Sequence, residues 1–239
     1  MKNVQQNSRR WISVAGMVCL MAVSLTSCLK NNNNTVVQPP AAALSVINAS
    51  PDAPSLDFYL DANKANSYPF GYGNGIDYIS AFAGKRQAIF KTAGSATVYK
   101  TDSVTLQQNK YYTLYLTNVA PNTEYLLLND TIVKPADGKA SIRLVNVSKD
   151  APAVDLAIKG GPVLVANKSF KGFSGFVPVA VNNNSTIEIR QAGTATVLAT
   201  IEKVSLNNGS IYTVWLQGLA SATDTKKLTA LIQTNVFYY

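Results

Sequence analysis

Four aspartates stand in a ten-residue stretch that the chain uses twice, and their spacing could support chemistry. The first copy is Asn48-Ala-Ser-Pro-Asp-Ala-Pro-Ser-Leu-Asp57 and the second is Asn146-Val-Ser-Lys-Asp-Ala-Pro-Ala-Val-Asp155, with six of the ten positions identical. Paired carboxylates can hydrolyse a glycosidic bond when they flank a sugar. Carboxylate-rich turns can also hold calcium, which takes roughly six to eight oxygen ligands.

A tight turn at the start of each domain explains the same residues without chemistry. Asp52 stands where a type I turn favours a short polar residue, and Pro54 keeps the residue before it extended. The side chains of Asn48 and Ser50 can satisfy the amides of such a turn. Asp57 falls on the polar side of the following strand, so we expect a solvated carboxylate there. We favour the structural turn, with metal binding and a catalytic pair as alternatives.

A second candidate is the segment Tyr68-Pro-Phe-Gly-Tyr-Gly-Asn-Gly-Ile-Asp-Tyr78, which is rich in glycine and aromatic residues. Exposed tyrosines on a flexible loop could stack on sugar rings or hold a protein partner. We therefore predict Tyr68, Tyr72 and Tyr78 as ligand-binding residues. The alternative is that the aromatic side chains of this segment cover one end of a domain.

The body of the chain lacks the residue types on which most hydrolases and zinc sites depend. The sequence has no histidine, and its two cysteines, Cys19 and Cys28, both lie near the N-terminus. Without histidine, a serine nucleophile has no base to complete a triad. We therefore expect a protein that is not an enzyme and that holds no metal and no cofactor. An aspartate-dependent glycan hydrolase is the alternative.

The charge balance does not favour nucleic acid as a partner. The formal net charge is +8, and it falls to +5 without residues 1–27, which carry three basic residues and no acid. The remaining basic residues are scattered along the sequence, whereas nucleic-acid binding needs a clustered basic face.

The N-terminal residues have the features of a targeting segment. A basic pair, Arg9-Arg10, precedes an apolar run that is short for a membrane span and typical of a signal peptide. The sequence Leu-Thr-Ser-Cys28 that follows resembles the lipobox of bacterial lipoproteins. We therefore predict a signal peptide at 1–27, acylation of Cys28 (palmitate-type chains), and a lipid anchor in the outer membrane, on either face. An ordinary signal peptide or an uncleaved anchor is the alternative.

Short β-type runs alternate with turn clusters from about residue 43 onwards. Leu56, Phe58 and Leu60 alternate with polar neighbours, as in a strand with one buried face. A second repeat, Ala93-Gly-Ser-Ala-Thr-Val98, returns as Ala192-Gly-Thr-Ala-Thr-Val197 with five of six residues identical. We predict an all-β fold of two tandem antiparallel β-sandwiches, immunoglobulin-like or transthyretin-like. The expected segments are a flexible tether at 28–42, sandwiches at 43–133 and 141–239, and a linker at 134–140.

The repeated residues resemble the bacterial domain of unknown function 4397, here in two tandem copies. The resemblance rests on the Asn-x-Ser-x-Asp-Ala-Pro-x-x-Asp stretch, the aromatic segment and the late Tyr-Thr strand, and Lys149 departs from it where the first copy has Pro51. The asparagine-rich tether resembles those of lipoproteins of the Bacteroidetes. The resemblance implies an extracytoplasmic β-sandwich and no established activity. We expect a non-catalytic binding or structural module for a protein or glycan of the cell envelope.

Overall fold

The computed structural model describes residues 39–239, and all regular secondary structure in this range is β-strand. Pro39–Tyr239 form one compact unit, in which no helix is long and apolar enough to cross a membrane. The predicted signal peptide, Cys28 and most of the predicted tether lie outside the described residues. The first eight strands are β1 (Ala41–Asn48), β2 (Leu56–Leu60), β3 (Asn63–Lys64), β4 (Gly75–Phe82), β5 (Gly84–Thr92), β6 (Val98–Leu106), β7 (Tyr111–Thr117) and β8 (Glu124–Asp130). The last eight are β9 (Lys139–Asn146), β10 (Val154–Ile158), β11 (Val163–Lys168), β12 (Val177–Ala180), β13 (Asn182–Gln191), β14 (Val197–Leu206), β15 (Ser210–Gln217) and β16 (Thr229–Phe237).

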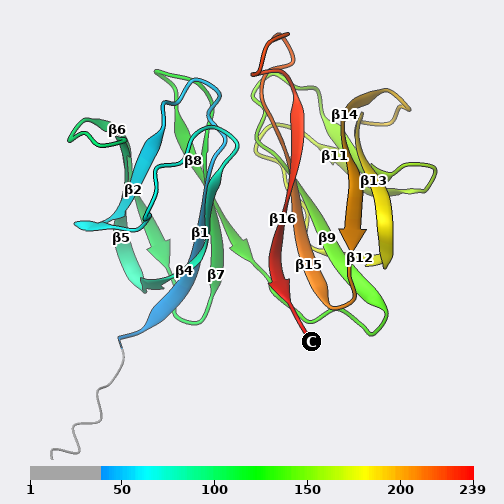
Figure 1. The fold of residues 1–239 in the computed structure, drawn as a ribbon, viewed down its shortest axis with the longest axis horizontal. Helices are drawn as coiled ribbons and strands as arrows, with labels where there is room; N and C mark the ends of the chain where they lie inside the picture. Colours follow the sequence, from blue (N-terminus) through cyan, green and yellow to red (C-terminus); the bar gives the residue numbers. More distant parts are fainter. Residues whose placement is uncertain (1–38) are drawn as a thin grey trace, which may run out of the picture. The chain divides into compact units, whose positions relative to one another are not determined.

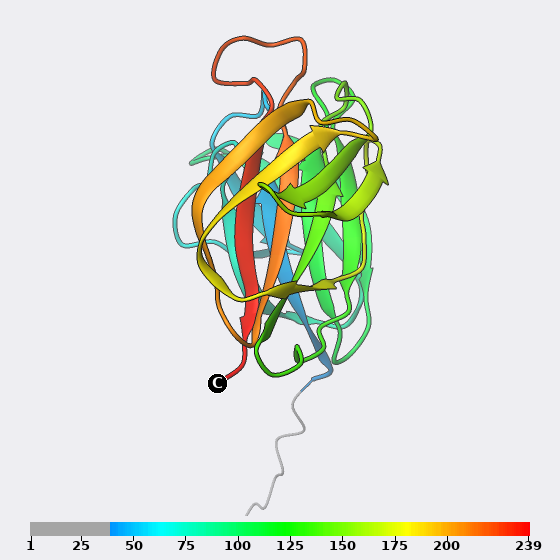
Figure 2. The same cartoon turned by 90° about the vertical axis from the view of Figure 1, so that its right-hand side faces the viewer.

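Each half of the described chain is a sandwich of two four-stranded sheets, which confirms the predicted all-β fold (Figure 1). The sheets of the first half have the orders β4-β1-β7-β8 and β3-β2-β5-β6. The second half repeats both orders as β12-β9-β15-β16 and β11-β10-β13-β14. Figure 2 looks onto the second half, where β13 and β14 form a separate layer in front of β15 and β16. The internal repeat of the sequence is therefore also a repeat of topology.

One pairing in each sandwich departs from the predicted antiparallel arrangement. Strand β1 runs parallel to β7, and β9 runs parallel to β15. Parallel neighbours need a long connection between them. Here the connection is formed by the five strands of the same sandwich that lie between the two in sequence. The first strand of each copy is therefore fixed in the middle of a sheet by the seventh.

The core of each sandwich comes from side chains that alternate along its strands. In the first copy Phe58 of β2 and Phe90 of β5 are fully buried, with ring centroids 5.0 Å apart. Leu156 of β10 and Ile189 of β13, which are paired across the sheet, are buried in the second copy. The period of two in the sequence therefore correctly marks the side chains that face the core.

Strands β1, β7, β9 and β15 are buried on both faces, whereas the sequence pattern predicts strands with one buried and one solvent-exposed face. Leu114 of β7 enters the core of its own sandwich, whereas Tyr115 points the other way and packs against Trp215 of β15, with ring centroids 6.3 Å apart. The sheets that contain β1 and β9 thus face each other, and burial of each such aromatic side chain contributes about 1.5–3 kcal/mol. The shared cluster consists of Ile47, Ala49, Tyr115, Leu128, Val145, Val147 and Trp215.

The strand ends differ by a few residues from the segment limits that the sequence suggests. Strand β1 begins at Ala41, so the last two residues of the segment taken as tether belong to a sheet. Ala41 pairs with Phe82 across β4. Alanine is depleted in strands, and so the sequence pattern does not mark this start. Between β8 and β9 the chain has no regular structure from 131 to 138.

Candidate functional site

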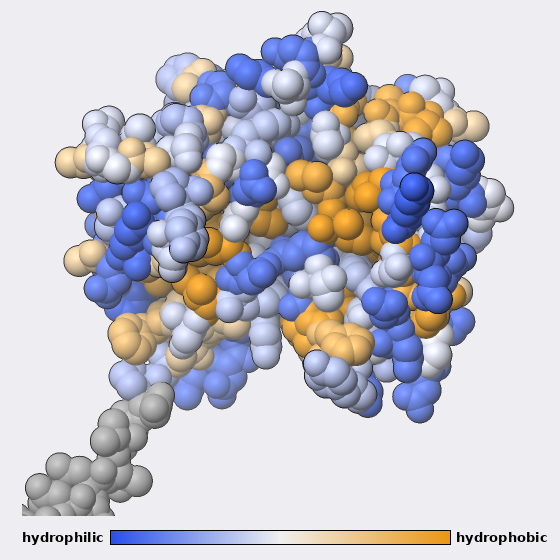
Figure 3. All heavy atoms as spheres, viewed as in Figure 1, coloured by the Kyte–Doolittle hydropathy of each residue, from blue (hydrophilic) through white to orange (hydrophobic). Residues whose placement is uncertain are grey.

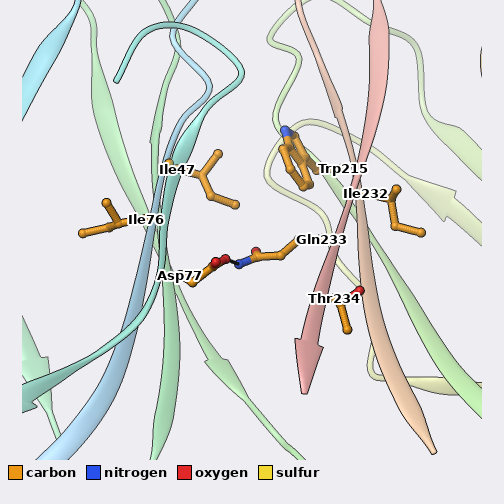
Figure 4. A pocket seen from close by; sticks show the side chains of 8 residues that line it. Ile47, Ile76, Asp77, Trp215, Ile232, Gln233 and Thr234 are labelled. Carbon is orange, nitrogen blue, oxygen red and sulfur yellow. Dashed lines mark hydrogen bonds between the residues drawn. The ribbon is translucent and has the colours of Figure 1, made fainter. Parts of the chain in front are cut away.

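A groove follows the boundary between the two sandwiches, between β4 of the first and β16 of the second (Figure 4). It has a volume of about 360 Å³, and hydrophobic and hydrophilic surfaces lie side by side along it in Figure 3. Both strands are at sheet edges, so each presents backbone N–H and C=O groups without a neighbouring strand. The lining residues are Gly75, Ile76 and Asp77 of β4, Ile232, Gln233 and Thr234 of β16, and the deeper Ile47 and Trp215.

A hydrogen bond crosses the groove and joins its two walls. The Gln233 amide donates to the Asp77 carboxylate at 3.0 Å and to the Ser45 hydroxyl at 3.2 Å. The Ser45 hydroxyl in turn donates to the Ile76 carbonyl at 2.9 Å. The Gln233 carbonyl oxygen is buried and has no partner among the described residues. An unpaired buried acceptor is costly, so a donor that reached it would bind favourably.

Gly75 allows the wall of the groove to form. A Cβ atom at this position would lie 2.2 Å from the backbone oxygen of Val46, which is closer than side chains ever come. Gly75 is paired with Ile47, so any larger residue would push the start of β4 away from β1. The glycine therefore holds this edge strand against the sheet that faces the second sandwich.

A buried ion pair joins the sandwiches at the same boundary. Arg143 of β9 lies 2.6 Å from the carboxylate of Asp130 in β8, and both side chains are almost fully buried. The Asp130 carboxylate also accepts a hydrogen bond from Thr113 at 2.6 Å, and Arg143 donates to Thr213 at 2.8 Å. Charges removed from water in this way are stable only when they are paired and hydrogen-bonded, as these are.

Tyr78 closes this network into a ring of hydrogen bonds. Its hydroxyl donates to Asp130 at 2.6 Å and accepts from the Asn235 amide at 3.0 Å, while Thr213 donates to the Asn235 carbonyl oxygen at 2.6 Å. Burial first, and then the negative charge of Asp130, raise the pKa of Tyr78 well above its usual value. The phenol therefore stays protonated and keeps donating at any physiological pH.

The three tyrosines predicted to bind a ligand lie in different environments. Tyr68 projects into solvent with 84% of its surface exposed. The Tyr72 hydroxyl is buried close to Gln217 of the second sandwich, and burial raises the pKa of Tyr72 to about 12. Tyr72 and Tyr78 thus contact the junction, and none of the three tyrosines lines the groove. A ligand-binding role for them stays a prediction.

In each copy, side chains of the repeated Asn-x-Ser-x-Asp stretch form hydrogen bonds between the turn after the first strand and the loop after the seventh strand. Ser50 donates to the Asn118 carbonyl at 2.8 Å, and Asp52 accepts from the Ala120 amide at 2.8 Å. The second copy repeats both bonds, with Ser148 donating to the Gly218 carbonyl at 2.7 Å and Asp150 accepting from the Ala220 amide at 2.7 Å.

Asp57 is not the solvated carboxylate that the sequence pattern predicts. It is 3% exposed and accepts from Asn66 at 3.0 Å and from the Gly94 amide at 3.2 Å, with the Lys64 amine at 2.8 Å. Hydrogen bonding by Lys64 lowers the pKa of Asp57, although burial opposes it. The expectation was wrong because Lys64 and Asn66, which follow β2, and a hairpin turn from the second repeated motif fold over the polar face of β2.

Asp155 has the same function in the second copy. Its carboxylate accepts hydrogen bonds from the backbone N–H groups of Gly193 at 2.9 Å and Asn167 at 2.7 Å. The two motifs that recur in the sequence are therefore contact partners in each sandwich. Within residues 39–239, no three His, Cys, Asp or Glu side chains are grouped closely enough to hold a metal ion.

Sequence comparison gives a partial identification. Residues 42–157 match the family model "Domain of unknown function (DUF4397)". The range covers the first sandwich and continues through β9 into β10, so it includes both copies of the repeated stretch. The resemblance noted from these residues is confirmed over this range, and two tandem copies of the domain stay a prediction. None of the curated proteins matches the sequence.

Comparison of folds gives weak likenesses to solved structures, among them the following three. CBMbc (family CBM26) from Eubacterium rectale Amy13K, in complex with maltoheptaose, aligns at 12% identity over 82% of this chain and 97% of its own, with a TM-score of 0.27. Family 41 carbohydrate-binding modules from streptococcal virulence factors, described for alpha-glucan recognition, align at 15% identity over 73% and 92%, with a TM-score of 0.25. The Bacillus anthracis TIE protein aligns at 11% identity over 74% and 34%, with a TM-score of 0.24. Scores this low carry no inference about what this chain binds.

Proposed function

We propose that this protein is a non-catalytic binding module of the cell envelope, with a lipid anchor at Cys28 and a glycan ligand in the groove between β4 and β16. The observation that carries the proposal is the groove itself, where an apolar floor meets carboxylate, amide and hydroxyl side chains. Ligand sites combine apolar walls with a few placed polar groups in this way. The second sandwich would be another copy of the same domain.

The size of the groove favours a sugar over a protein partner. A stable protein interface buries roughly 1,200–2,000 Å² in total, far more than one groove of this kind offers. A sugar ring presents C–H groups on its faces and hydroxyls around its rim. Its faces suit the Ile47 and Trp215 side chains of the floor (Figure 4), and its hydroxyls suit Asp77, Gln233 and Thr234.

The junction beneath the groove supports a rigid site. The Asn235 amide of β16 donates to the Tyr78 hydroxyl of β4 and Tyr78 donates to Asp130 of the buried ion pair, which joins the two walls and leaves little to order when a ligand binds. Preorganised sites lose less free energy on binding than sites that must first close. The duplication would then have a function, because the groove exists only where two copies meet.

Replacing both polar residues that bridge the groove is expected to weaken binding. Titration calorimetry of residues 39–239 would use glycan strands released from peptidoglycan and polysaccharide released from lipopolysaccharide. The Asp77→Ala/Gln233→Ala variant loses about two hydrogen bonds, so we expect a roughly 10- to 100-fold higher Kd. The matched control, Asp102→Ala/Gln87→Ala on the outer sheet of the first sandwich, should bind like the wild type. Equal affinity of the two variants would exclude the groove, and no heat with either probe would exclude a glycan of these two classes.

The proposed anchor has its own test. In the bacterium, a metabolic fatty-acid probe should label the full chain and leave Cys28→Ala unlabelled, because Cys28 carries the thiol that is acylated. Cys19→Ala is the matched control, since residues 1–27 would be removed, and it should be labelled like the wild type. Labelling of Cys28→Ala at the wild-type level would overturn the anchor.

The alternative of a glycan hydrolase finds little support at the residues it needs. Asp57 and Asp155 each accept hydrogen bonds from backbone or side-chain donors of their own sandwich. They bind their own hairpin turns, which leaves neither carboxylate placed to act as a nucleophile or an acid.

A further inference from the structure

One end of the body brings together the point where the tether enters, the linker between the sandwiches and the C-terminus (Figures 1 and 2). The strand register fixes this arrangement, because Ala41 pairs with Phe82, Tyr111 with Asp130 and Ser210 with Phe237. Backbone hydrogen bonds from Ala83 to Pro40 (2.8 Å) and from Gly209 to Lys139 (2.9 Å) join the loops. We name this surface the tether end and define it by residues 82–86, 107–111, 131–139, 181, 207–210 and 237–239.

The tether end holds more than half of the large exposed hydrophobic side chains of the described chain. Tyr239 is fully exposed, and its ring packs against that of Phe237 with centroids 4.7 Å apart. Val133, in the linker, is 67% exposed. Monomeric proteins rarely gather exposed apolar side chains in one place unless something covers them. The six residues are Phe82, Tyr111, Val133, Val181, Phe237 and Tyr239.

The same surface carries unpaired positive charge. Lys85, Lys110, Lys134 and Lys139 are exposed, and none of them forms a salt bridge with another residue in the range 39–239. Asp137 is the one acidic residue among the segments that define the tether end. Scattered in the sequence, these lysines are brought together by the fold.

We propose that the tether end docks on anionic lipid headgroups of the membrane in which the chain is anchored. The proposal rests on the proposed anchoring at Cys28. The chain between Cys28 and Pro39 can span at most about 40 Å, so this end of the body stays near the bilayer. Aromatic side chains are favoured at the membrane interface, and lysines are attracted to anionic headgroups. Docking would hold the groove at a fixed height above the membrane.

The lysines favour a lipid surface over a second copy of this chain. A symmetric dimer through the tether end would place the same lysines against each other, with a single acid per copy to offset them. An anionic bilayer offers opposite charge at every lysine and an interface for the aromatic rings. Self-association through this end would therefore be opposed by charge, whereas docking on lipid is favoured by it.

Vesicle binding by residues 39–239 tests the proposal, since this range forms the compact unit and lacks the anchor. We expect co-sedimentation with vesicles of phosphatidylglycerol and phosphatidylcholine, and little with phosphatidylcholine alone. Each lysine near an anionic surface contributes roughly fivefold to the partition coefficient. The Lys110→Gln/Lys134→Gln/Lys139→Gln variant should therefore bind roughly 100-fold more weakly than the wild type at the same ionic strength.

A charge-matched variant shows whether the location or the total charge matters. Lys149→Gln/Lys226→Gln/Lys227→Gln removes the same charge from loops at the opposite end, and it should bind within roughly twofold of the wild type. Equal loss in both variants, or no binding to anionic vesicles, would overturn the proposal. If residues 39–239 sedimented as a dimer, and if the Lys110→Gln/Lys134→Gln/Lys139→Gln variant disrupted that dimer, the tether end would instead be a contact surface for a second copy of the chain. The body lacks Cys28, so failure of the anchor would leave these results unchanged.

Discussion

Replacing Arg143 by methionine is expected to lower the free energy of unfolding of residues 39–239 by about 3–5 kcal/mol. The substitution keeps most of the side-chain volume but leaves the Asp130 carboxylate buried without its cation. It also removes the donor to Thr213 and opens the ring of hydrogen bonds between the sandwiches. Urea unfolding followed by far-ultraviolet circular dichroism would measure the change.

Two further variants show whether burial of the ion pair causes the loss of stability. Lys171→Met removes an ion pair with Glu124 that also joins the sandwiches but is partly exposed, so its cost should be at most about 1 kcal/mol. The double variant Asp130→Asn/Arg143→Met leaves no unpaired charge and should recover part of the loss. If Arg143→Met cost no more than Lys171→Met, the buried pair would not be what holds the junction together.

The Asp57→Asn variant is expected to lose about 1.5–3 kcal/mol of stability at pH 7, which is the range for a hydrogen-bonded charged group. Asparagine keeps the size of the side chain but gives up the charge that Lys64 pairs with. It also turns an NH2 group towards donors such as the Gly94 amide. Asp102→Asn is the matched control, because Asp102 is exposed on β6 and should change stability by less than about 0.5 kcal/mol.

The effect of Asp57→Asn should depend on pH in a defined direction. The pKa of Asp57 is lowered in the folded protein from the ordinary value of 3.8, so on acidification the unfolded chain takes up the proton first. The contribution of Asp57 is therefore complete above the unfolded pKa and is lost as the pH falls through the folded one. The stability difference between wild type and variant should be full at pH 7 and should shrink below about pH 4. A difference that stayed constant down to pH 2 would assign the effect to packing.

The fold could be predicted from the sequence because its signals are local and occur twice. Alternation at Leu56, Phe58 and Leu60 identifies a strand and the face that it turns to the core, and the repeated stretches indicate two sandwiches. The turn at Ser50 and Asp52 follows from residue types that favour turns, whereas the hydrogen bonds that these two side chains form with Asn118 and Ala120, 68 residues away, do not. The environment of Asp57 could not be predicted in this way, because neither Lys64 nor Asn66 lies in a repeated motif and the Gly94 turn comes 37 residues later in the chain.

The groove could not be predicted, because its walls come from strands far apart in the sequence. Asp77 lies in the candidate segment 68–78, but Gln233 is 156 residues away and lies in no motif. One signal was available, since Tyr111-Tyr-Thr-Leu-Tyr-Leu116 and Ile211-Tyr-Thr-Val-Trp-Leu216 are apolar on both faces. Runs of this kind indicate a sheet covered on both sides. They predict that the two sandwiches pack together, although not where the boundary opens.

Trp215 provides the most direct measurement of whether the groove at the junction binds a glycan. It lies at the floor of the groove and is the only tryptophan in residues 39–239, since the other is Trp11. Titration of the body with the two envelope glycan fractions should change its fluorescence emission in a saturable way, with the same Kd as calorimetry. The change should disappear at the same concentrations in Asp77→Ala/Gln233→Ala. Unchanged Trp215 emission at glycan concentrations where calorimetry shows saturation would contradict binding in the groove.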